Sequence, residues 1–183
     1  MAFEAQLQQI SLINEEVRSV FGSLAPDELN WKPHPQKWSI GQQFDHLMTT
    51  NGLYFPIFES IIRGEYRPSL WARISPLSGL FGRMLVNSMG PESKRKIKTA
   101  TAFEPSASQV KADIVANFLT QQQQLSQYME ALSAPSQTKI IITSPASGFI
   151  TYSLQHAVEL LVVHEKRHIA QARSLLKIMR EAT

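Results

Sequence analysis

The sequence predicts an all-α protein built as a four-helix bundle. In four long segments, apolar residues recur at three- and four-residue steps, which is the pattern of helices that bury one face. Proline-rich stretches separate these segments, and no segment carries a convincing sheet pattern. With 183 residues, 43% of them apolar, the chain can bury the core of one compact domain. We therefore expect a single domain over residues 1–183.

The first two helices have clear limits. An apolar stripe predicts the first helix over residues 3–24, and prolines between 25 and 38 form a turn that stops it. The second helix begins at Ser39-Ile40-Gly41-Gln42, which spells a capping box, and ends near Gly64. Pro56 lies inside this helix and would remove one hydrogen bond, so we expect a helix that is bent but not broken.

The connection between the second and third helices is long, over residues 65–105. A connection of this length usually has a function or holds structure of its own, and we expect it to roof a pocket. Ser75-Pro76 predicts the start of a short helix that ends at Gly90. The basic run over residues 94–98 favours a solvated loop over an anion-binding element.

The last two helices enclose a short extended segment. Ser106-Ala107-Ser108-Gln109 spells a second capping box, which predicts a third helix that begins there and is stopped by Pro135. Residues 140–143 are β-branched enough for a short extended segment. A further apolar stripe predicts the fourth helix over residues 151–180.

Composition limits the classes of function. The chain has no Cys, which excludes disulfides, thiolate nucleophiles and Cys-type zinc sites, so a metal would be held by His and carboxylate. A net charge of +3, with both signs interspersed, is too small to indicate nucleic-acid binding. There is no signal-like N-terminus and no apolar run long enough for a bilayer. We expect a cytoplasmic protein with no membrane or nucleic-acid partner.

A metal-binding pattern lies in the fourth helix. His164 and His168 enclose Glu165 in an H-E-x-x-H spacing, the metalloprotease pattern. Residues four apart share a helix face with Cβ atoms roughly 5–6 Å apart, so both imidazoles can bind one ion. The protease pattern is incomplete, because Gln171 and Ser174 occupy the positions of the Gly and His of its extended form. A third ligand has to come from upstream.

His46 is the best upstream candidate, since it lies early in the second helix on a face that can turn inward. His34 lies in the proline-rich turn, where we expect it to be exposed. His156 lies on the same helix as the pair, roughly 12 Å from His164 along the axis, which is too far for the same ion.

Two segments resemble the signatures of the DinB/YfiT-like superfamily of metalloenzymes. Trp38-Ser39-Ile40-Gly41-Gln42 followed by Phe44-Asp45-His46-Leu47 resembles its W-S-I-x-[EQ]-x-x-x-H-L segment, and His164-Glu165-x-x-His168-Ile169-x-Gln171 resembles its H-x-x-x-H-x-x-Q segment. The order of elements and the chain length fit as well, so the resemblance covers nearly the whole chain. It implies a four-helix bundle whose zinc, nickel or iron ion is bound by His46, His164 and His168.

The resemblance also implies an activity, because characterised relatives include thiol S-transferases that use bacillithiol and mycothiol-dependent isomerases. Three neutral imidazoles leave the charge of a divalent metal uncompensated and at least one position open, which is the layout of a catalytic site. We therefore expect a metal-dependent enzyme acting on a small electrophilic substrate. The reaction would be thiol S-transfer, with a low-molecular-weight thiol as cosubstrate, or hydrolysis.

Two further residues are candidates for roles in this site. Gln171 lies within about 20° of His164 on the helical wheel, where it could orient a ligand or water. Glu165 is turned about 80° from the mean direction of the two histidines. It is a candidate general base, but a carboxylate outside the metal's own ligands or at the surface is the preferred interpretation.

The competing hypothesis is a non-catalytic bundle that binds a metal or senses a ligand and acts through a partner or a dimer. An open metal position beside a pocket favours the enzyme, and a metal sealed by apolar side chains favours the scaffold. The broad apolar surface of the second helix is compatible with a homodimer.

Overall fold

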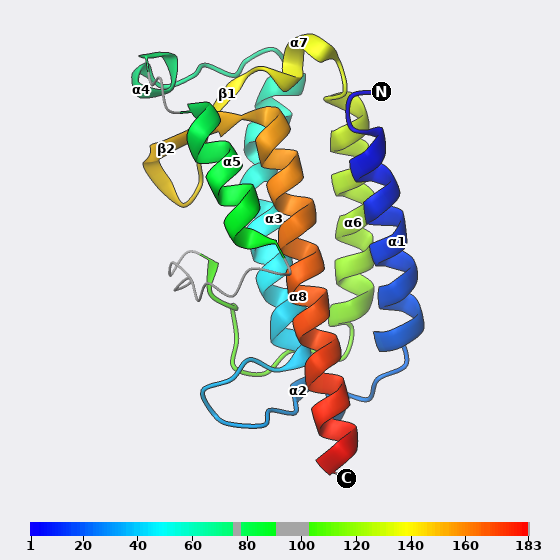
Figure 1. The fold of residues 1–183 in the computed structure, drawn as a ribbon. Coiled ribbons are helices and arrows are strands. Elements are labelled where there is room, and N and C mark those ends of the chain that lie inside the picture. Colours follow the sequence, from blue (N-terminus) through cyan, green and yellow to red (C-terminus); the bar gives the residue numbers. More distant parts are fainter. Residues whose placement is uncertain (75–77, 91–102, 183) are drawn as a thin grey trace.

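The computed structural model describes residues 1–74, 78–90 and 103–182. Four long helices form a bundle (Figure 1): α1 (Glu4–Phe21), α3 (Ile40–Ile62), α6 (Ile114–Ala131) and α8 (Leu154–Ala182). Both α1 and α3 pack against α6 and α8, so the four helices surround a common core. The predicted four-helix bundle is confirmed.

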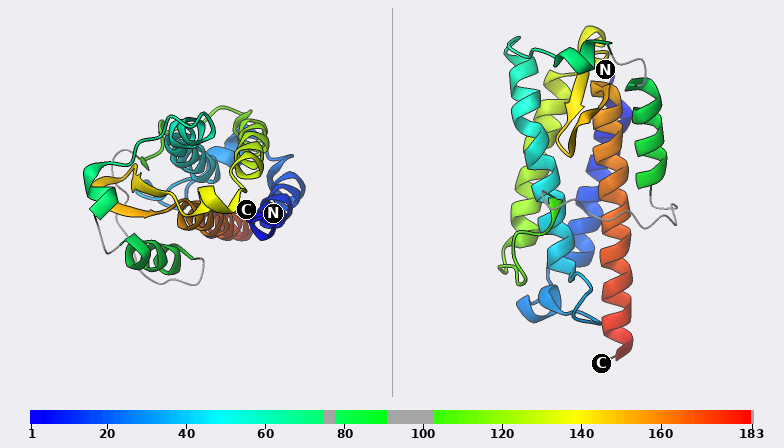
Figure 2. Two further views of the ribbon diagram at one scale, coloured as in Figure 1. Left: turned by 90° about the horizontal axis from the view of Figure 1, so that it is seen from above. Right: turned by 90° about the vertical axis from the view of Figure 1, so that its left-hand side faces the viewer.

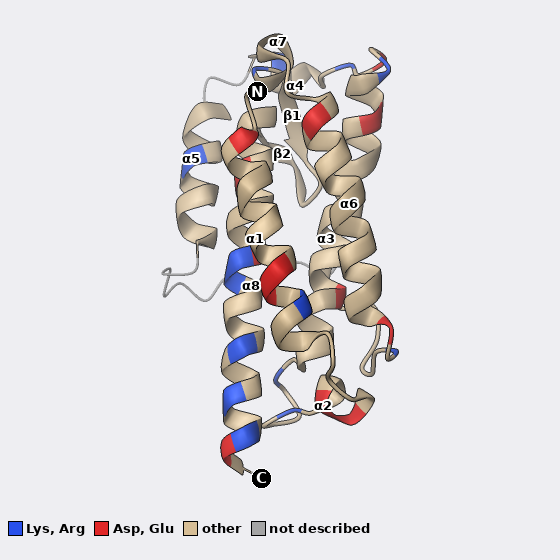
Figure 3. Cartoon of the chain, turned by 90° about the vertical axis from the view of Figure 1, so that its right-hand side faces the viewer, with Lys and Arg blue, Asp and Glu red and all other residues tan. Residues whose placement is uncertain are grey.

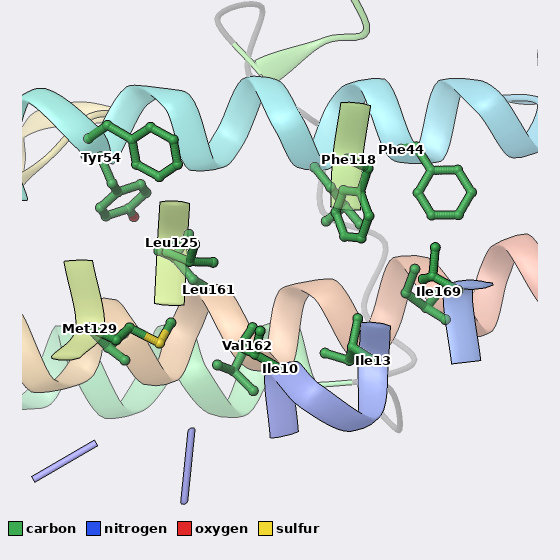
Figure 4. Close-up of a cluster of buried hydrophobic side chains, with 14 of the residues drawn as sticks. Ile10, Ile13, Phe44, Tyr54, Phe118, Leu125, Met129, Leu161, Val162 and Ile169 are labelled. Atoms are coloured by element: carbon green, nitrogen blue, oxygen red, sulfur yellow. The ribbon is translucent and has the colours of Figure 1, made fainter. Parts of the chain in front are cut away.

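The core is apolar and largely aromatic at one level of the bundle. Phe44 on α3 packs against Phe21 and Phe118, with ring centroids 5.3 and 5.2 Å apart. Figure 4 shows the neighbouring side chains from the four helices, among them Ile10, Ile13, Leu125, Val162 and Ile169. Burying one such side chain stabilises the fold by about 1.5–3 kcal/mol, so the core holds the helices in fixed rotations about their axes.

The limits of α3 follow the sequence signals. The Ser39 hydroxyl accepts from the Gln42 amide and the Gln42 side chain accepts from the Ser39 amide, both at 3.2 Å, so the predicted capping box is formed. The helix continues through Pro56 without a break. Gly64, with φ of 70°, then adopts the left-handed conformation that ends many helices and that glycine tolerates best.

The third bundle helix begins later than predicted. The Ser106 amide and hydroxyl both donate to the Asp45 carboxylate on α3, and the hydroxyl bond is 2.9 Å. Ser106 is therefore bonded to α3 and does not cap a helix that begins at its own position. The predicted start at Ser106 is wrong, and α6 begins at Ile114.

The long connection holds structure, as predicted. The expected short helix is α5 (Ser78–Met89), and α4 (Leu70–Ile74) precedes it without having been predicted. The predicted cap at Ser75-Pro76 and the basic run over 94–98 lie outside the described residues. Two other short helices, α2 (Pro26–Asn30) and α7 (Pro135–Thr138), begin at prolines, whose fixed φ suits a first helical residue.

A β-hairpin takes the place of the predicted start of the fourth helix. β1 (Ile141–Ser144) pairs antiparallel with β2 (Ser147–Ser153), and Ile142 lies opposite Tyr152 with both side chains buried. The extended segment is therefore confirmed, but it has a partner strand. Residues 151–153 belong to that strand, so the predicted helix start at 151 is wrong and α8 begins at Leu154.

The helix α5 lies outside the bundle, against α8 and β2 (Figure 2). A Cβ atom on Gly82 would lie 2.5 Å from Cγ of His156, so the two helices approach closely here. We expect Gly82→Ala to lower the free energy of unfolding by about 1–3 kcal/mol, because the methyl group has no space. Urea denaturation measures this change.

Gly79→Ala is the matched control, because Gly79 lies on the same helix and a Cβ there meets nothing within 4 Å. Alanine should stabilise the helix at that position by up to about 1 kcal/mol. Equal stabilities of the two variants would contradict the close packing of α5 on α8.

Among the described residues, Glu165 is the one Lys, Arg, Asp or Glu that is buried. Lys and Arg form bands along the C-terminal half of α8 (Figure 3). Arg173 in this region pairs with Glu16 on α1 at 2.5 Å. Within the described part of the chain, no helix combines the length and apolarity that crossing a membrane requires.

Candidate metal centre

Three imidazoles meet between α3 and α8. His46 from α3 and His164 and His168 from α8 each offer one ring nitrogen, and these nitrogens lie within 4.8 Å of one another. Nε2 of His46 is 3.1 Å from Nε2 of His164. Two nitrogens bound to one tetrahedral zinc ion at 2.0–2.1 Å would lie about 3.3 Å apart, so the spacing fits a shared ion. The structure thus brings together the three predicted histidines, all of them buried.

Hydrogen bonds on the far side of two rings set their orientation. Nδ1 of His168 donates to Oε1 of Gln43 at 2.6 Å, and Nδ1 of His46 donates to the Phe103 carbonyl. A ring that carries its proton on Nδ1 presents the lone pair of Nε2, which is the atom that faces the cluster. Both rings are therefore held in the form that binds a metal.

Gln43 is a residue of the candidate site that the sequence patterns do not predict. It lies three residues before His46, which places both side chains on one helix face, but that spacing alone does not single out a partner for His168. The sequence singled out Gln171 instead. Gln171 lines the adjoining pocket, but none of the hydrogen bonds among the described residues joins it to the cluster.

We expect Gln43→Leu to weaken zinc binding by roughly 10–100-fold, because His168 loses the acceptor that fixes its ring. Gln171→Leu is the matched control and should change the affinity far less. Competition with a zinc-sensitive dye measures both constants. Equal losses in the two variants would contradict the assignment of Gln43 as the positioning residue.

The cluster carries no charge of its own at neutral pH. Burial lowers the pKa of His164 to about 3, and the nearby charges of His46 and Arg167 act in the same direction. Burial also lowers the pKa of His168 far below its usual range. It lowers the pKa of His46, an effect partly offset by the Phe103 carbonyl and by Asp45. Neutral imidazole is the form that ligates metal.

These shifts predict how the metal-free protein responds to acid. Below pH 6.5, the histidines of the unfolded chain take up protons while the buried rings of the folded protein stay neutral. The free energy of unfolding therefore decreases as the pH is lowered. The shift of His164 alone should lower the free energy of unfolding by about 2 kcal/mol at pH 5. Glu165 has a raised pKa, so it takes up a proton in the folded protein between pH 7 and 4.5 and opposes this loss of stability. Its effect is smaller than the combined effect of the three histidines.

Urea denaturation of chelator-treated protein at pH 7 and pH 5 measures the difference. Glu165→Gln removes the opposing carboxyl group and should make the loss at pH 5 steeper. Equal or greater stability of the metal-free protein at pH 5 would contradict the neutral state of the cluster.

Glu165 points away from the cluster and into the core. Its Oε1 accepts from the side-chain amides of Asn51 on α3 and Gln122 on α6, at 2.8 and 2.7 Å. Burial raises its pKa to about 7, although both hydrogen bonds act against the rise. Its interpretation as a surface carboxylate is wrong, because the side chain is fully buried.

A pocket of about 520 Å³ adjoins the cluster between α3, α5, α8 and the hairpin. Trp38 covers one side of the site, with its ring stacked on His168 at a centroid distance of 6.1 Å. The expected roof is present in part, since Leu85, Met89 and Phe103 from the long connection line the pocket. Glu165 does not line it. His34 is exposed, as predicted.

Comparison with known proteins identifies the family. A family model described as the DinB superfamily matches residues 9–172, a range that contains all three histidines and Gln43. No curated protein matches the chain.

Proposed function

The chain belongs to the DinB superfamily, and from this membership and its converging imidazoles we propose that it is a metal-dependent enzyme. It acts on a small electrophilic substrate, by thiol S-transfer or by hydrolysis. The proposal rests on where the histidines lie: His46, His164 and His168 meet at the wall of a pocket of about 520 Å³. A structural metal site, in contrast, is closed by its own ligands.

The donor set supports zinc or nickel, with iron as a third choice, because imidazole nitrogen suits these ions. Three neutral ligands would leave the charge of a divalent ion uncompensated and its coordination incomplete. When bound, such an ion lowers the pKa of a water or a thiol toward neutrality, which generates a nucleophile.

The protein's own residues prepare the site for that chemistry. Gln43 and the Phe103 carbonyl fix two of the three rings, and Trp38 shields them on one side. The chain has no Cys, so a thiol nucleophile has to arrive on a small-molecule cosubstrate. Both reactions need a nucleophile beside the cluster and an electrophile in the pocket, and they differ only in the nucleophile.

The test is turnover by zinc- and nickel-loaded protein. Nitrophenyl esters report hydrolysis, and chlorodinitrobenzene with cysteine or glutathione reports thiol transfer. We expect turnover of at least one probe that requires the metal and is lost in His46→Ala. Metal-loaded protein with no turnover above that variant would favour the non-catalytic, ligand-sensing bundle instead.

A further inference from the structure

Positively charged side chains line the pocket beside the cluster. Among its described lining residues, the charged side chains are Lys37 and Arg167, and none is a carboxylate. Glu165 is the acid nearest in sequence to the two histidines of α8, and it bonds to Asn51 and Gln122 in the core. A divalent metal on neutral imidazoles would add further positive charge. A ligand with a negative head group therefore complements this end of the pocket.

Arg167 directly precedes His168 on α8. It lines the pocket together with His164 and His168. It donates to the Ser88 carbonyl at 3.2 Å, which fixes the side chain against α5. A guanidinium is the side chain best suited to bind a carboxylate or phosphate, through parallel N–H donors.

The pocket is elongated, and many of the side chains that line it are apolar. Leu160 lies on α8 eight residues before His168, and Tyr54 lies on α3 eight residues after His46. Eight residues of helix span about 12 Å, so the pocket extends that far from the cluster toward the hairpin. Leu85 on α5 and Ile150 on β2 also line the pocket.

We propose that the substrate is an amphiphilic anion, with an acidic head group at Arg167 and the histidine cluster and an unbranched apolar chain directed toward Ile150. This substrate class rests on the proposed function, because the metal supplies part of the positive charge at the head group. Arg167 is a binding residue for the head group, and the apolar wall selects the chain.

Calorimetric titration of the zinc-loaded protein tests the proposal, with decanoate below its micelle concentration as the probe. Decanoate should bind at least tenfold more tightly than decyltrimethylammonium, which has the opposite charge, and than hexanoate, which has a shorter chain. Arg167→Gln should weaken decanoate binding by roughly tenfold or more, the effect of losing a charged hydrogen-bond donor. Lys166→Gln, a neighbouring residue outside the pocket lining, should change it less than twofold.

A second pair of variants tests the apolar end independently of Arg167. Ile150 lines the pocket, whereas the adjacent Phe149 is 80% exposed and does not line it. Ile150→Asn should weaken decanoate binding by about tenfold, because a polar group replaces apolar contact with the chain. Phe149→Asn, in the same strand, should leave binding unchanged.

The outcomes separate this inference from the proposed function. Protein that binds zinc but does not distinguish decanoate from decyltrimethylammonium overturns the substrate class and leaves the metal site intact. Protein that binds no zinc but still prefers decanoate supports the anion-binding pocket and removes the metal-dependent function. Equal effects of Arg167→Gln and Lys166→Gln would also overturn the inference.

Discussion

His46→Ala should abolish zinc binding and leave the helical bundle intact. The variant removes the one ligand from α3, so the two remaining histidines on α8 bind at best as a weak pair. We expect the affinity to fall by roughly a thousandfold, more than the 10–100-fold cost of losing an outer hydrogen bond. Alanine is a good helix former, so the far-ultraviolet circular dichroism should not change. Elemental analysis after gel filtration gives the zinc content.

His34→Ala is the control for this variant, because His34 is exposed in the turn before α3. Its zinc content should equal that of the wild type. Unchanged zinc content in His46→Ala would remove this residue from the site and would contradict the three-histidine centre.

Glu165→Ala should have the largest effect on stability. The carboxyl group joins α8 to Asn51 on α3 and to Gln122 on α6, and all three side chains are fully buried. Alanine leaves two buried amide donors without an acceptor and opens a cavity. We expect the free energy of unfolding to fall by about 3–5 kcal/mol, as measured by urea denaturation.

Glu165→Gln separates the hydrogen bonds from the charge. Asn51 Oδ1, Gln122 Oε1 and Glu165 Oε2 are buried without a hydrogen-bond partner among the described residues. A glutamine amide can donate to such oxygens, so this variant should lose less than about 1 kcal/mol. Glu159→Ala, at a more exposed position on α8, should be nearly neutral. Similar stabilities of Glu165→Ala and Glu159→Ala would contradict this role.

The H-E-x-x-H spacing thus has a different meaning here from the one it has in metalloproteases. His164 and His168 face α3 and the pocket, while Glu165 faces the core between α3 and α6. The residue that is a base in the proteases connects three helices in this protein. Its connection fixes the rotation of α8, and that rotation directs both histidines toward His46.

Local sequence patterns were sufficient for the bundle and for the histidine cluster. The capping box at Ser39 and the four apolar stripes depend on neighbouring residues, and so does the four-residue spacing of His164 and His168. His46 followed because it occupies an inward position early in α3. Each of these features is determined by contacts within one helix or by which face of a helix is apolar.

The features that the sequence did not predict depend on contacts between distant segments. Ser106 was expected to cap its own helix, but it binds Asp45, 61 positions away. The apolar stripe of the fourth helix extends to Thr151 and therefore predicts helix there. The stripe carries no information on strand pairing, and in the structure Thr151 pairs with Thr143 of β1. Gln43 carries no local signal either, since its partner His168 is 125 positions away.

The most direct test of the central claim is the zinc X-ray absorption spectrum of protein purified without an affinity tag and loaded with one equivalent of zinc. The three-histidine centre predicts three imidazole nitrogens at about 2.0–2.1 Å and one additional, exchangeable light ligand. Zinc with fewer than three imidazoles, or zinc lost on gel filtration, would contradict the claim.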